Sequence, residues 1–377
     1  MTVITPSRPA QAVRVAERVL SARAGSAVTL ADPIDLGGSG RTSVVRARVA
    51  QNPLSLDRSL VLKVFPADAH DGAFARELAS YKYATALPSD SRPGPQLIAS
   101  DTAARLLVLS DLGDGRSMVE LLGSTDWSDT SHAISAWGQA LGRMHAATVG
   151  GEADFAALLR HGPGHETVEA VRVPAGAAVQ VAADLIAAAV GVRLHAEVLE
   201  MLHQCPHLFS DGDHRAFSPS DVGPPNILIN DDGVQFMDYE WGGFRDATLD
   251  IAYALVTFVP ELAPRWMARR DELETALIDA WRSEIQAIWP ALVHDGQMHR
   301  KVLAARTLWV WLSTAWMLDP DLDVDQRTHG LAVRSNDPAV LVARWRDLSA
   351  AGRRIGLVGM GDSCAEVADA LDAAWHR

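Results

Sequence analysis

Two short apolar runs in the middle of the chain, residues 227–229 and 234–237, constrain its fold more than any other feature. An Asn/Asp/Gly turn at residues 230–233 separates them, Asn226 precedes the first run, and Asp238 follows the second. Two short apolar runs joined by such a turn predict a β-hairpin. We therefore expect Asn226 and Asp238 to lie together at the open end of this hairpin.

The polar side chains at the ends of the predicted hairpin suit a divalent cation. The carboxylate of Asp238 and the amide oxygen of Asn226 are hard ligands of the kind that Mg²⁺ takes, with waters and phosphate oxygens completing its shell. Asp221 lies five residues before Asn226, on the preceding loop, where it can accept a proton from a hydroxyl nucleophile. The stretch therefore predicts a magnesium site beside a general base.

The same stretch resembles the catalytic loop and metal-binding segment of the aminoglycoside phosphotransferase and choline kinase-like family, which has a protein kinase-like fold. The usual form in that family is His-Gly-Asp-x-x-x-x-Asn-Ile-Leu, followed by an apolar run and Asp-Trp/Tyr-Glu. The corresponding parts here are Pro219–Leu228 and Met237–Glu240. The pair Asp246 and Asp250 also resembles the aspartates that follow the metal ligand in the family.

Two positions of the loop depart from the family pattern, because Pro219 replaces its histidine and Ser220 replaces its glycine. The histidine of the family supports the loop rather than transferring the proton, so its loss bears on rate and loop rigidity more than on the type of reaction. The resemblance implies that Asp221 is the base and that Asn226 and Asp238 hold Mg²⁺.

A glycine-rich turn near the N-terminus precedes the strand-like alternation of residues 44–49. Such a turn can lay its backbone over nucleotide phosphates, because glycine permits close approach and unusual dihedral angles. Gly38, Ser39 and Gly40 carry this signal, although Ser43 stands where a kinase loop has its third glycine. We expect the backbone of these three residues to cover the phosphates of ATP.

A single lysine, Lys63, interrupts the apolar strand pattern of residues 59–65. A lysine in a buried strand needs an anionic partner, since its desolvation is otherwise costly. The candidates are Glu77, within the helical pattern of residues 73–87, and the phosphates of ATP. The resemblance implies the lysine–glutamate pair of a kinase small lobe, in which Lys63 holds the α- and β-phosphates.

A further apolar strand, residues 105–109, runs into a Gly/Asp turn and then into a short helical pattern. The residues themselves indicate only the end of a strand. The resemblance implies that this segment is the hinge of the fold, where the backbone from Ser110 to Leu112 binds the edge of adenine.

Apolar residues spaced by three and four predict amphipathic helices before and after these motifs, among them residues 10–24 and 131–148. His145, near the end of the second helix, is predicted to be structural. The most apolar window, residues 176–192, predicts one buried helix, because it is too short and too polar to span a bilayer.

The resemblance implies an α+β, two-lobed protein kinase-like fold. We expect a small, β-rich nucleotide-binding lobe with a leading helix over residues 1–111. A large, mainly helical lobe with the catalytic loop and the acceptor pocket is expected over residues 112–377.

The composition is that of a globular protein in a reducing compartment. The 377 residues are 48% hydrophobic and 21% charged, and two cysteines do not make a disulfide framework. We expect a cytoplasmic protein without a membrane partner, because the N-terminus lacks a long apolar core. The net charge of −13 speaks against nucleic acid as the main partner and slightly favours a cationic acceptor.

Together these patterns predict an ATP- and Mg²⁺-dependent kinase that transfers the γ-phosphoryl group to a hydroxyl of a small molecule. Aminoglycosides, amino sugars, sugars, amino alcohols and nucleoside analogues all remain open as acceptors, and so does the oligomeric state. A pseudokinase that binds nucleotide without transfer is the alternative, and Pro219 is its best support. Transfer of a nucleotidyl group is a third possibility.

Overall fold

The computed structural model describes residues 8–38, 42–51, 58–66, 71–162, 171–322 and 330–375. The chain forms two compact units. Unit 1 comprises Met1–Gly115, Ala153–Thr167 and Asn230–Gly242, and unit 2 comprises Arg116–Glu152, Val168–Ile229 and Gly243–Arg377. The predicted division at residue 111 stays a prediction.

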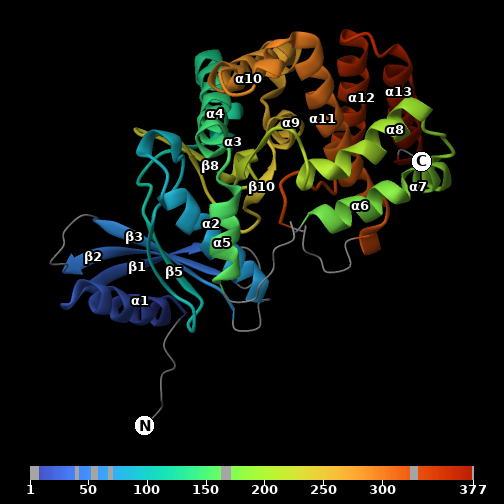
Figure 1. Ribbon diagram of the computed structural model, residues 1–377. Helices are drawn as coiled ribbons and strands as arrows, with labels where there is room; N and C mark the ends of the chain where they lie inside the picture. Colours follow the sequence, from blue (N-terminus) through green and yellow to red (C-terminus); the bar gives the residue numbers. More distant parts are fainter. Residues whose placement is uncertain are drawn as a thin grey trace. The chain divides into compact units, whose positions relative to one another are not determined.

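Unit 1 is built on a five-stranded antiparallel sheet with the strand order β1-β2-β3-β5-β4. Helix α1 lies against the sheet, as Figure 1 shows in blue at the start of the chain. The helices and strands of this unit are α1 (Arg8–Ala24), β1 (Thr29–Gly37), β2 (Ser43–Gln51), β3 (Ser59–Val64), α2 (Asp71–Thr85), β4 (Leu97–Asp101), β5 (Leu106–Ser110), nearly all of α5 (Glu152–Arg160), and β9 (Gly233–Phe236).

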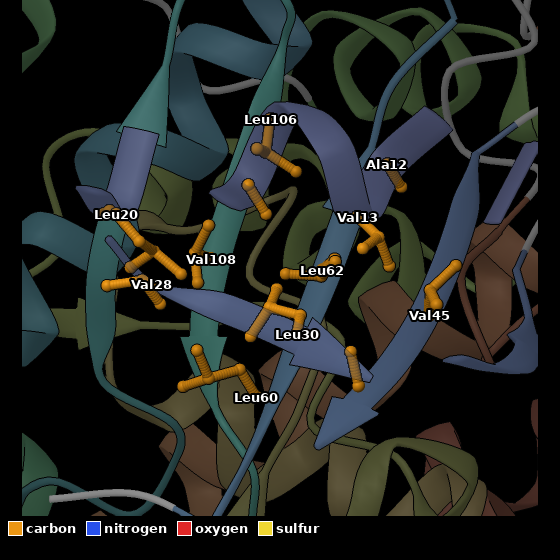
Figure 2. Packing of buried hydrophobic residues seen from close by; sticks show 13 residues of the cluster. Ala12, Val13, Leu20, Val28, Leu30, Val45, Leu60, Leu62, Leu106 and Val108 are labelled. Carbon is orange, nitrogen blue, oxygen red and sulfur yellow. The ribbon is translucent and has the colours of Figure 1, made fainter. Parts of the chain in front are cut away.

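The core of unit 1 fills the space between α1 and one face of the sheet. Figure 2 shows Val13 and Leu20 from the helix meeting Val45, Leu62 and Val108 from three strands. Successive side chains of a strand point to opposite faces. Because Leu62 faces α1, the next residue of β3 points to the other face of the sheet, away from this core.

Unit 2 is mainly helical, and α11, α12 and α13 pack in sequence within it (Figure 1). Its helices and strands are β6 (Arg116–Ser117), α3 (Met118–Leu122), α4 (Trp127–Thr148), α6 (Arg172–Gln180), α7 (Ala182–Val190), α8 (Ala196–Gln204), β7 (Arg215–Ser218), β8 (Ile227–Asn230, of which Asn230 belongs to unit 1), β10 (Gly243–Asp246), α9 (Thr248–Thr257), α10 (Arg270–Ile285), α11 (Asp295–Leu318), α12 (Pro338–Arg354) and α13 (Val358–Trp375). Short 3-10 helices cover Ser89–Ser91, Cys205–Phe209, Pro224–Asn226, Val259–Glu261, Pro264–Arg269, Pro290–Val293 and Pro320–Leu322.

Helices α4 and α10 approach closely because α4 carries glycines at the contact. A Cβ atom on Gly138 would lie 2.4 Å from the carbonyl oxygen of Leu277, and one on Gly142 would lie 2.8 Å from that of Trp281. Side chains at these two positions would push the helices apart. The close approach places Trp281 beside the end of α4.

The predicted helix over residues 176–192 is wrong, because α6 and α7 occupy this region as two helices bent by 59°. Within the part of the chain that the structure describes, no single helix is long and apolar enough to cross a membrane. This bent pair meets the length and composition criteria only when its two helices are taken together.

The predicted α+β class is confirmed by these two units. The β-rich unit holds the antiparallel sheet with α1 and α2, and the larger unit is mainly helical.

Candidate functional site

The loop that carries Asp221 begins where β7 ends. Ser218, the last residue of β7, accepts a hydrogen bond at Oγ from the backbone N–H of Ser220 at 2.8 Å. The same Oγ donates to Oδ1 of Asp250 on α9 at 2.8 Å. The loop is therefore fastened to α9 by the residue just before its two unusual positions.

A buried chain of hydrogen bonds continues from Asp250 to α4 and α10. Trp281 donates through Nε1 to Nδ1 of His145 at 3.0 Å, and a tryptophan ring nitrogen can only donate. His145 therefore carries its proton on Nε2 and donates to Oδ2 of Asp250, also at 3.0 Å. Both ring nitrogens of His145 are occupied, as expected for a structural histidine.

These hydrogen bonds hold the start of the Asp221 loop, in which Pro219 stands where the family pattern has histidine. Proline has no backbone N–H and its side chain cannot donate. Ser218, Asp250, His145 and Trp281 together fix the start of the loop without any donor from that position.

Ser220 has a left-handed backbone, with φ of +88°, which a residue with a side chain rarely adopts. Its hydroxyl is also buried and has no hydrogen-bond partner among the described residues. The family pattern has glycine at this position, and glycine adopts positive φ without steric cost. The departure at Ser220 therefore places strain directly before Asp221.

Replacing Ser220 by glycine is expected to raise the free energy of unfolding by about 1 kcal/mol, since it relieves both the backbone strain and the unpaired hydroxyl. The greater freedom of glycine in the unfolded chain offsets part of this gain. Chemical denaturation of the two proteins measures the difference. A variant that is less stable than the parent would show that the Ser220 conformation is not strained.

Asp221 is 4% exposed, and its carboxylate meets Asn226 on the 3-10 helix that follows the loop. Nδ2 of Asn226 donates to Oδ2 of Asp221 at 2.9 Å and to its backbone oxygen at 3.1 Å. Because its nitrogen bonds to Asp221, the amide oxygen of Asn226, which is the atom able to ligate a cation, takes no part in this contact. Tyr253 and Ala332 also donate to the Asp221 carboxylate.

Asp246, at the end of β10, is buried and its carboxylate binds the first residue of α9. It accepts at Oδ1 from Oγ1 of Thr248 at 2.6 Å and from its N–H at 3.0 Å, and at Oδ2 from the N–H of His214 at 3.1 Å. Burial alone would raise the pKa of Asp246, but hydrogen bonds from His214 and Thr248 outweigh it and lower the pKa to about 2. The contacts are those of a structural carboxylate.

In unit 1, Lys63 of β3 points away from the α1 core and into a group of carboxylates. Its Nζ lies 2.7 Å from Oε1 of Glu77 on α2 and 2.5 Å from Oδ1 of Asp238. Burial alone would lower the pKa of Lys63, but the charges of Glu77, Asp238 and Glu240 outweigh it and raise the pKa. Lys63 is therefore an ammonium group held between the carboxylate of Glu77 on α2 and the carboxylate of Asp238.

Glu77, Asp238 and Glu240 bring carboxylate oxygens within 4.8 Å of one another. Burial and the charges of Asp238 and Glu240 raise the pKa of Glu77, whereas the ammonium of Lys63 opposes this shift and favours the carboxylate. Three carboxylates around one ammonium leave an excess of negative charge, and Oε2 of the fully buried Glu77 has no hydrogen-bond partner among the described residues. This donor set fits a divalent cation with oxygen ligands.

The backbone around Asp238 is fixed by the next residue, Tyr239. Asp238 has φ of +60°, which is unusual for a residue with a side chain. Tyr239 stacks on Tyr81 of α2 with ring centroids 4.7 Å apart, and its hydroxyl donates to the carbonyl of Pro93 at 3.2 Å. A Cβ on Gly94 would lie 2.3 Å from that hydroxyl, so the glycine makes room for the tyrosine.

The predicted phosphate-binding turn lies partly outside the described residues. Ser39 and Gly40 fall outside them, whereas Gly38 follows directly after β1. Gly38 has φ of +148°, and a Cβ there would lie 2.2 Å from the carbonyl oxygen of Thr42. Only glycine fits this position, and its role toward ATP stays a prediction.

The predicted hinge residues make hydrogen bonds inside unit 1. The N–H of Ser110 donates to the carbonyl of Gln96 at 2.9 Å, and the carbonyl of Leu112 accepts from Nδ2 of Asn230 at 2.7 Å. Between them, the carboxylate of Asp111 accepts from Oγ of Ser59 at 2.6 Å. The segment is thus well fixed, and its contact with adenine stays a prediction.

The two predicted metal ligands belong to different units. Strands β8 and β9 flank the predicted turn, with only Asp231 and Asp232 between them, and the division between units falls at Ile229. The meeting of Asn226 with Asp238 therefore stays a prediction. Glu240 was not among the predicted site residues, but it lies with Asp238 in the carboxylate group. Its place at the end of the Asp-Tyr-Glu motif, two residues after Asp238, could have indicated this.

The sequence matches a protein-family model but none of the curated proteins. Residues 38–285, about two thirds of the chain, match the family model APH, described as the phosphotransferase enzyme family. No curated protein gives a significant match. The family match includes every predicted site residue, and the chain after Ile285 lies outside it.

Solved structures similar to the chain include kinases of three descriptions. A choline/ethanolamine kinase family protein from Mesorhizobium loti is 15% identical, with 89% of this chain and 92% of that chain covered and a TM-score of 0.46. Choline kinase from Cryptosporidium parvum is 12% identical, covering 88% and 93%, with a TM-score of 0.48. A thermostable mutant of aminoglycoside phosphotransferase APH(4)-Ia is 16% identical, covering 90% and 99%, with a TM-score of 0.46.

Proposed function

The chain belongs to the APH phosphotransferase enzyme family, and from this premise we propose that it transfers the γ-phosphoryl group of ATP to a hydroxyl group of a small molecule. The observation that carries the proposal is the Lys63 cluster. A buried ammonium bonded to Glu77 and Asp238, with more carboxylates than cations around it, suits a phosphate chain and its metal ion.

Each predicted site residue has a role in this proposal. Lys63, oriented by Glu77, holds the α- and β-phosphates, and the backbone of Gly38, Ser39 and Gly40 covers them. The backbone from Ser110 to Leu112 takes the adenine edge. These are the roles that the family pattern implies for a phosphate-binding lobe.

The divalent cation is proposed to be Mg²⁺, held by Asn226 and Asp238. When bound, Mg²⁺ neutralises negative charge on the phosphate oxygens. The amide oxygen of Asn226 is available because its nitrogen is bonded to Asp221, and the carboxylates near Asp238 supply the oxygen chemistry that this ion prefers.

Asp221 is proposed to be the general base. It orients the acceptor hydroxyl and takes its proton, while the hydroxyl oxygen forms a bond to the γ-phosphorus. The bond from that phosphorus to the β–γ bridging oxygen breaks, and its electron pair leaves on ADP. Most of the rate enhancement in such sites comes from positioning and charge neutralisation.

The acceptor is a small molecule with a free hydroxyl, and the net charge of −13 favours one with a positive charge. The purified protein with Mg²⁺ and ATP should be tested against aminoglycosides, amino sugars, sugars and amino alcohols. We expect acceptor-dependent formation of ADP by the parent, and formation about 10³-fold slower by an Asp221→Asn variant.

The mass of the product separates transfer of a phosphoryl group from transfer of a nucleotidyl group. Binding of ATP without formation of ADP across the whole panel would contradict the proposal and favour a pseudokinase.

A further inference from the structure

Hydrogen-bond donors from several described residues meet the carboxylate of Asp221. Asn226 donates to Oδ2, the hydroxyl of Tyr253 donates to Oδ1, and the backbone N–H of Ala332 lies 3.1 Å from Oδ1 and 3.3 Å from Oδ2. An ionised carboxylate has about four lone-pair sites. The donors come from three separate parts of unit 2 and together fix the plane of the carboxylate.

The direction of the Tyr253 hydroxyl is set by Val333. The N–H of Val333 donates to the Tyr253 oxygen at 3.0 Å, so the one phenolic proton is directed at Asp221. Burial and the charge of Asp221 raise the pKa of Tyr253 well above its usual value, which keeps that proton in place. Tyr253 therefore serves as a fixed donor to Asp221.

Residues Leu331–Val333, which we call the 331–333 segment, are themselves held from α12. Nη1 of the buried Arg344 donates to the carbonyl of Val333 at 2.6 Å, and its Nε donates to the carbonyl of Val256 at 3.3 Å. Both Leu331 and Val333 are buried. Arg344 thus ties the 331–333 segment to α9, the helix that carries Tyr253.

The catalytic loop is shaped to receive this segment. A Cβ on Gly223, two residues after Asp221, would lie 2.8 Å from Cβ of Ala332 and 3.3 Å from the ring of Tyr253. A side chain at that position would push the 331–333 segment away from Asp221. Gly223 therefore permits the 331–333 segment to approach the loop closely enough to contact Asp221.

Most of these contacts come from outside the part of the chain that matches the family. The match ends at residue 285, whereas Ala332, Val333 and Arg344 lie beyond it. The family match therefore includes Asn226 and Tyr253 but not Ala332, nor the Val333 and Arg344 contacts that hold the Ala332 segment.

We propose that Tyr253 and the 331–333 segment, anchored by Arg344, are positioning elements that hold the Asp221 carboxylate in the orientation needed to take the acceptor proton. The inference rests on the proposed function, because it assigns the purpose of these contacts to the base. Holding a reacting group in a single geometry contributes strongly to rate, and a misplacement of about 1 Å can lower it about 100-fold.

Two variants test the proposal with a matched control. Tyr253→Phe removes only the hydroxyl, and Arg344→Met keeps most of the aliphatic stem while releasing the carbonyl of Val333. Thr314→Val is the control, because Oγ1 of the buried Thr314 accepts from Trp345 on α12 at 2.9 Å without any contact to Asp221. It removes a buried hydrogen bond between α11 and α12 of the same unit.

Hydrogen exchange of a peptide covering residues 330–337 is the first measurement. We expect faster exchange of the Ala332 and Val333 amides in Tyr253→Phe, in Arg344→Met and in Asp221→Ala, and unchanged exchange in Thr314→Val. This readout requires no acceptor. Full protection of the peptide in Tyr253→Phe and Asp221→Ala would overturn the proposed contacts.

Kinetics with the acceptor found in the panel are the second measurement. We expect kcat to fall about 10-fold in Tyr253→Phe and Arg344→Met, while KM for ATP stays unchanged, because orientation of the base is altered and the nucleotide site is not. Thr314→Val should keep the parental kcat.

The outcomes separate the two proposals. Released amides with an unchanged kcat would overturn the positioning role and leave the proposed function intact. An active Asp221→Asn variant, or absence of any turnover, would instead overturn the proposed function and with it the catalytic role of these residues.

Discussion

An Asp221→Asn variant is expected to transfer phosphoryl groups about 10³-fold more slowly than the parent, because a neutral amide cannot take the acceptor proton. The effect should appear in kcat, with KM for ATP unchanged, since Asp221 has no predicted contact with the nucleotide. Initial rates of ADP formation with saturating acceptor measure both constants.

Asparagine is the better replacement because of the donors that surround Asp221. Alanine would leave the Asn226 amide, the Tyr253 hydroxyl and the Ala332 N–H without their acceptor. Each unsatisfied donor costs about 1–3 kcal/mol, so part of any lost activity would come from lost stability. Asparagine keeps one oxygen acceptor and nearly the same volume.

The control for this prediction is the stability and nucleotide binding of the variant. ATP binding of Asp221→Asn should stay close to that of the parent. Its thermal stability should fall by less than that of Asp221→Ala, because the asparagine oxygen keeps the Tyr253 and Ala332 donors and only its nitrogen faces the Asn226 amide. An Asp221→Asn variant that kept more than about a tenth of the parental kcat would be inconsistent with the rate effect of a general base.

The sequence predicted the fold class and the order of the motifs, and the family match confirms the resemblance and the phosphotransferase class. Local patterns were sufficient for these features. The apolar pattern of residues 59–65 and the single lysine within it predicted an anionic partner for Lys63, and Oε1 of Glu77 lies 2.7 Å from its Nζ. The short strands around residues 230–233 also occur where the apolar runs predicted them.

The contacts of Asp221 could not be predicted from the sequence. Ala332 is 111 residues away along the chain and contacts Asp221 through a backbone N–H, which every residue except proline has. Tyr253 lies in α9, whose residues are all buried, so its position resembles that of an ordinary core residue. Nothing in the local pattern distinguishes either residue from a structural one.

The hydrogen bonds that hold the Asp221 loop could not be predicted from the sequence either. Pro219 in place of histidine predicted a less rigid loop, because nothing in the sequence around it indicates another source of support. The hydrogen bonds that fasten the loop come from Ser218, Asp250 and His145, which lie on three elements. Such a network depends on tertiary packing of α4 against α10, which no short motif encodes.

A Lys63→Met variant is expected to lose both activity and stability. Loss of the ammonium that neutralises the phosphates should lower kcat/KM for ATP by at least about 100-fold. The variant also leaves the fully buried Glu77 without its cation, and breaking a buried ion pair in this way costs about 3–5 kcal/mol. Lys82→Met, at an exposed position on α2, is the control and should change neither quantity.

A double variant separates the two losses. Lys63→Met combined with Glu77→Gln removes the uncompensated charge together with the ammonium, so we expect it to recover part of the free energy of unfolding while remaining inactive. Denaturation of the parent, both single variants and the double variant gives the coupling energy of the pair. Because the stabilising role of Lys63 lies in its pairing with Glu77 and its catalytic role lies in its charge toward ATP, only stability should return. Recovery of activity in the double variant would show that Lys63 acts through the fold alone and has no role in binding phosphate.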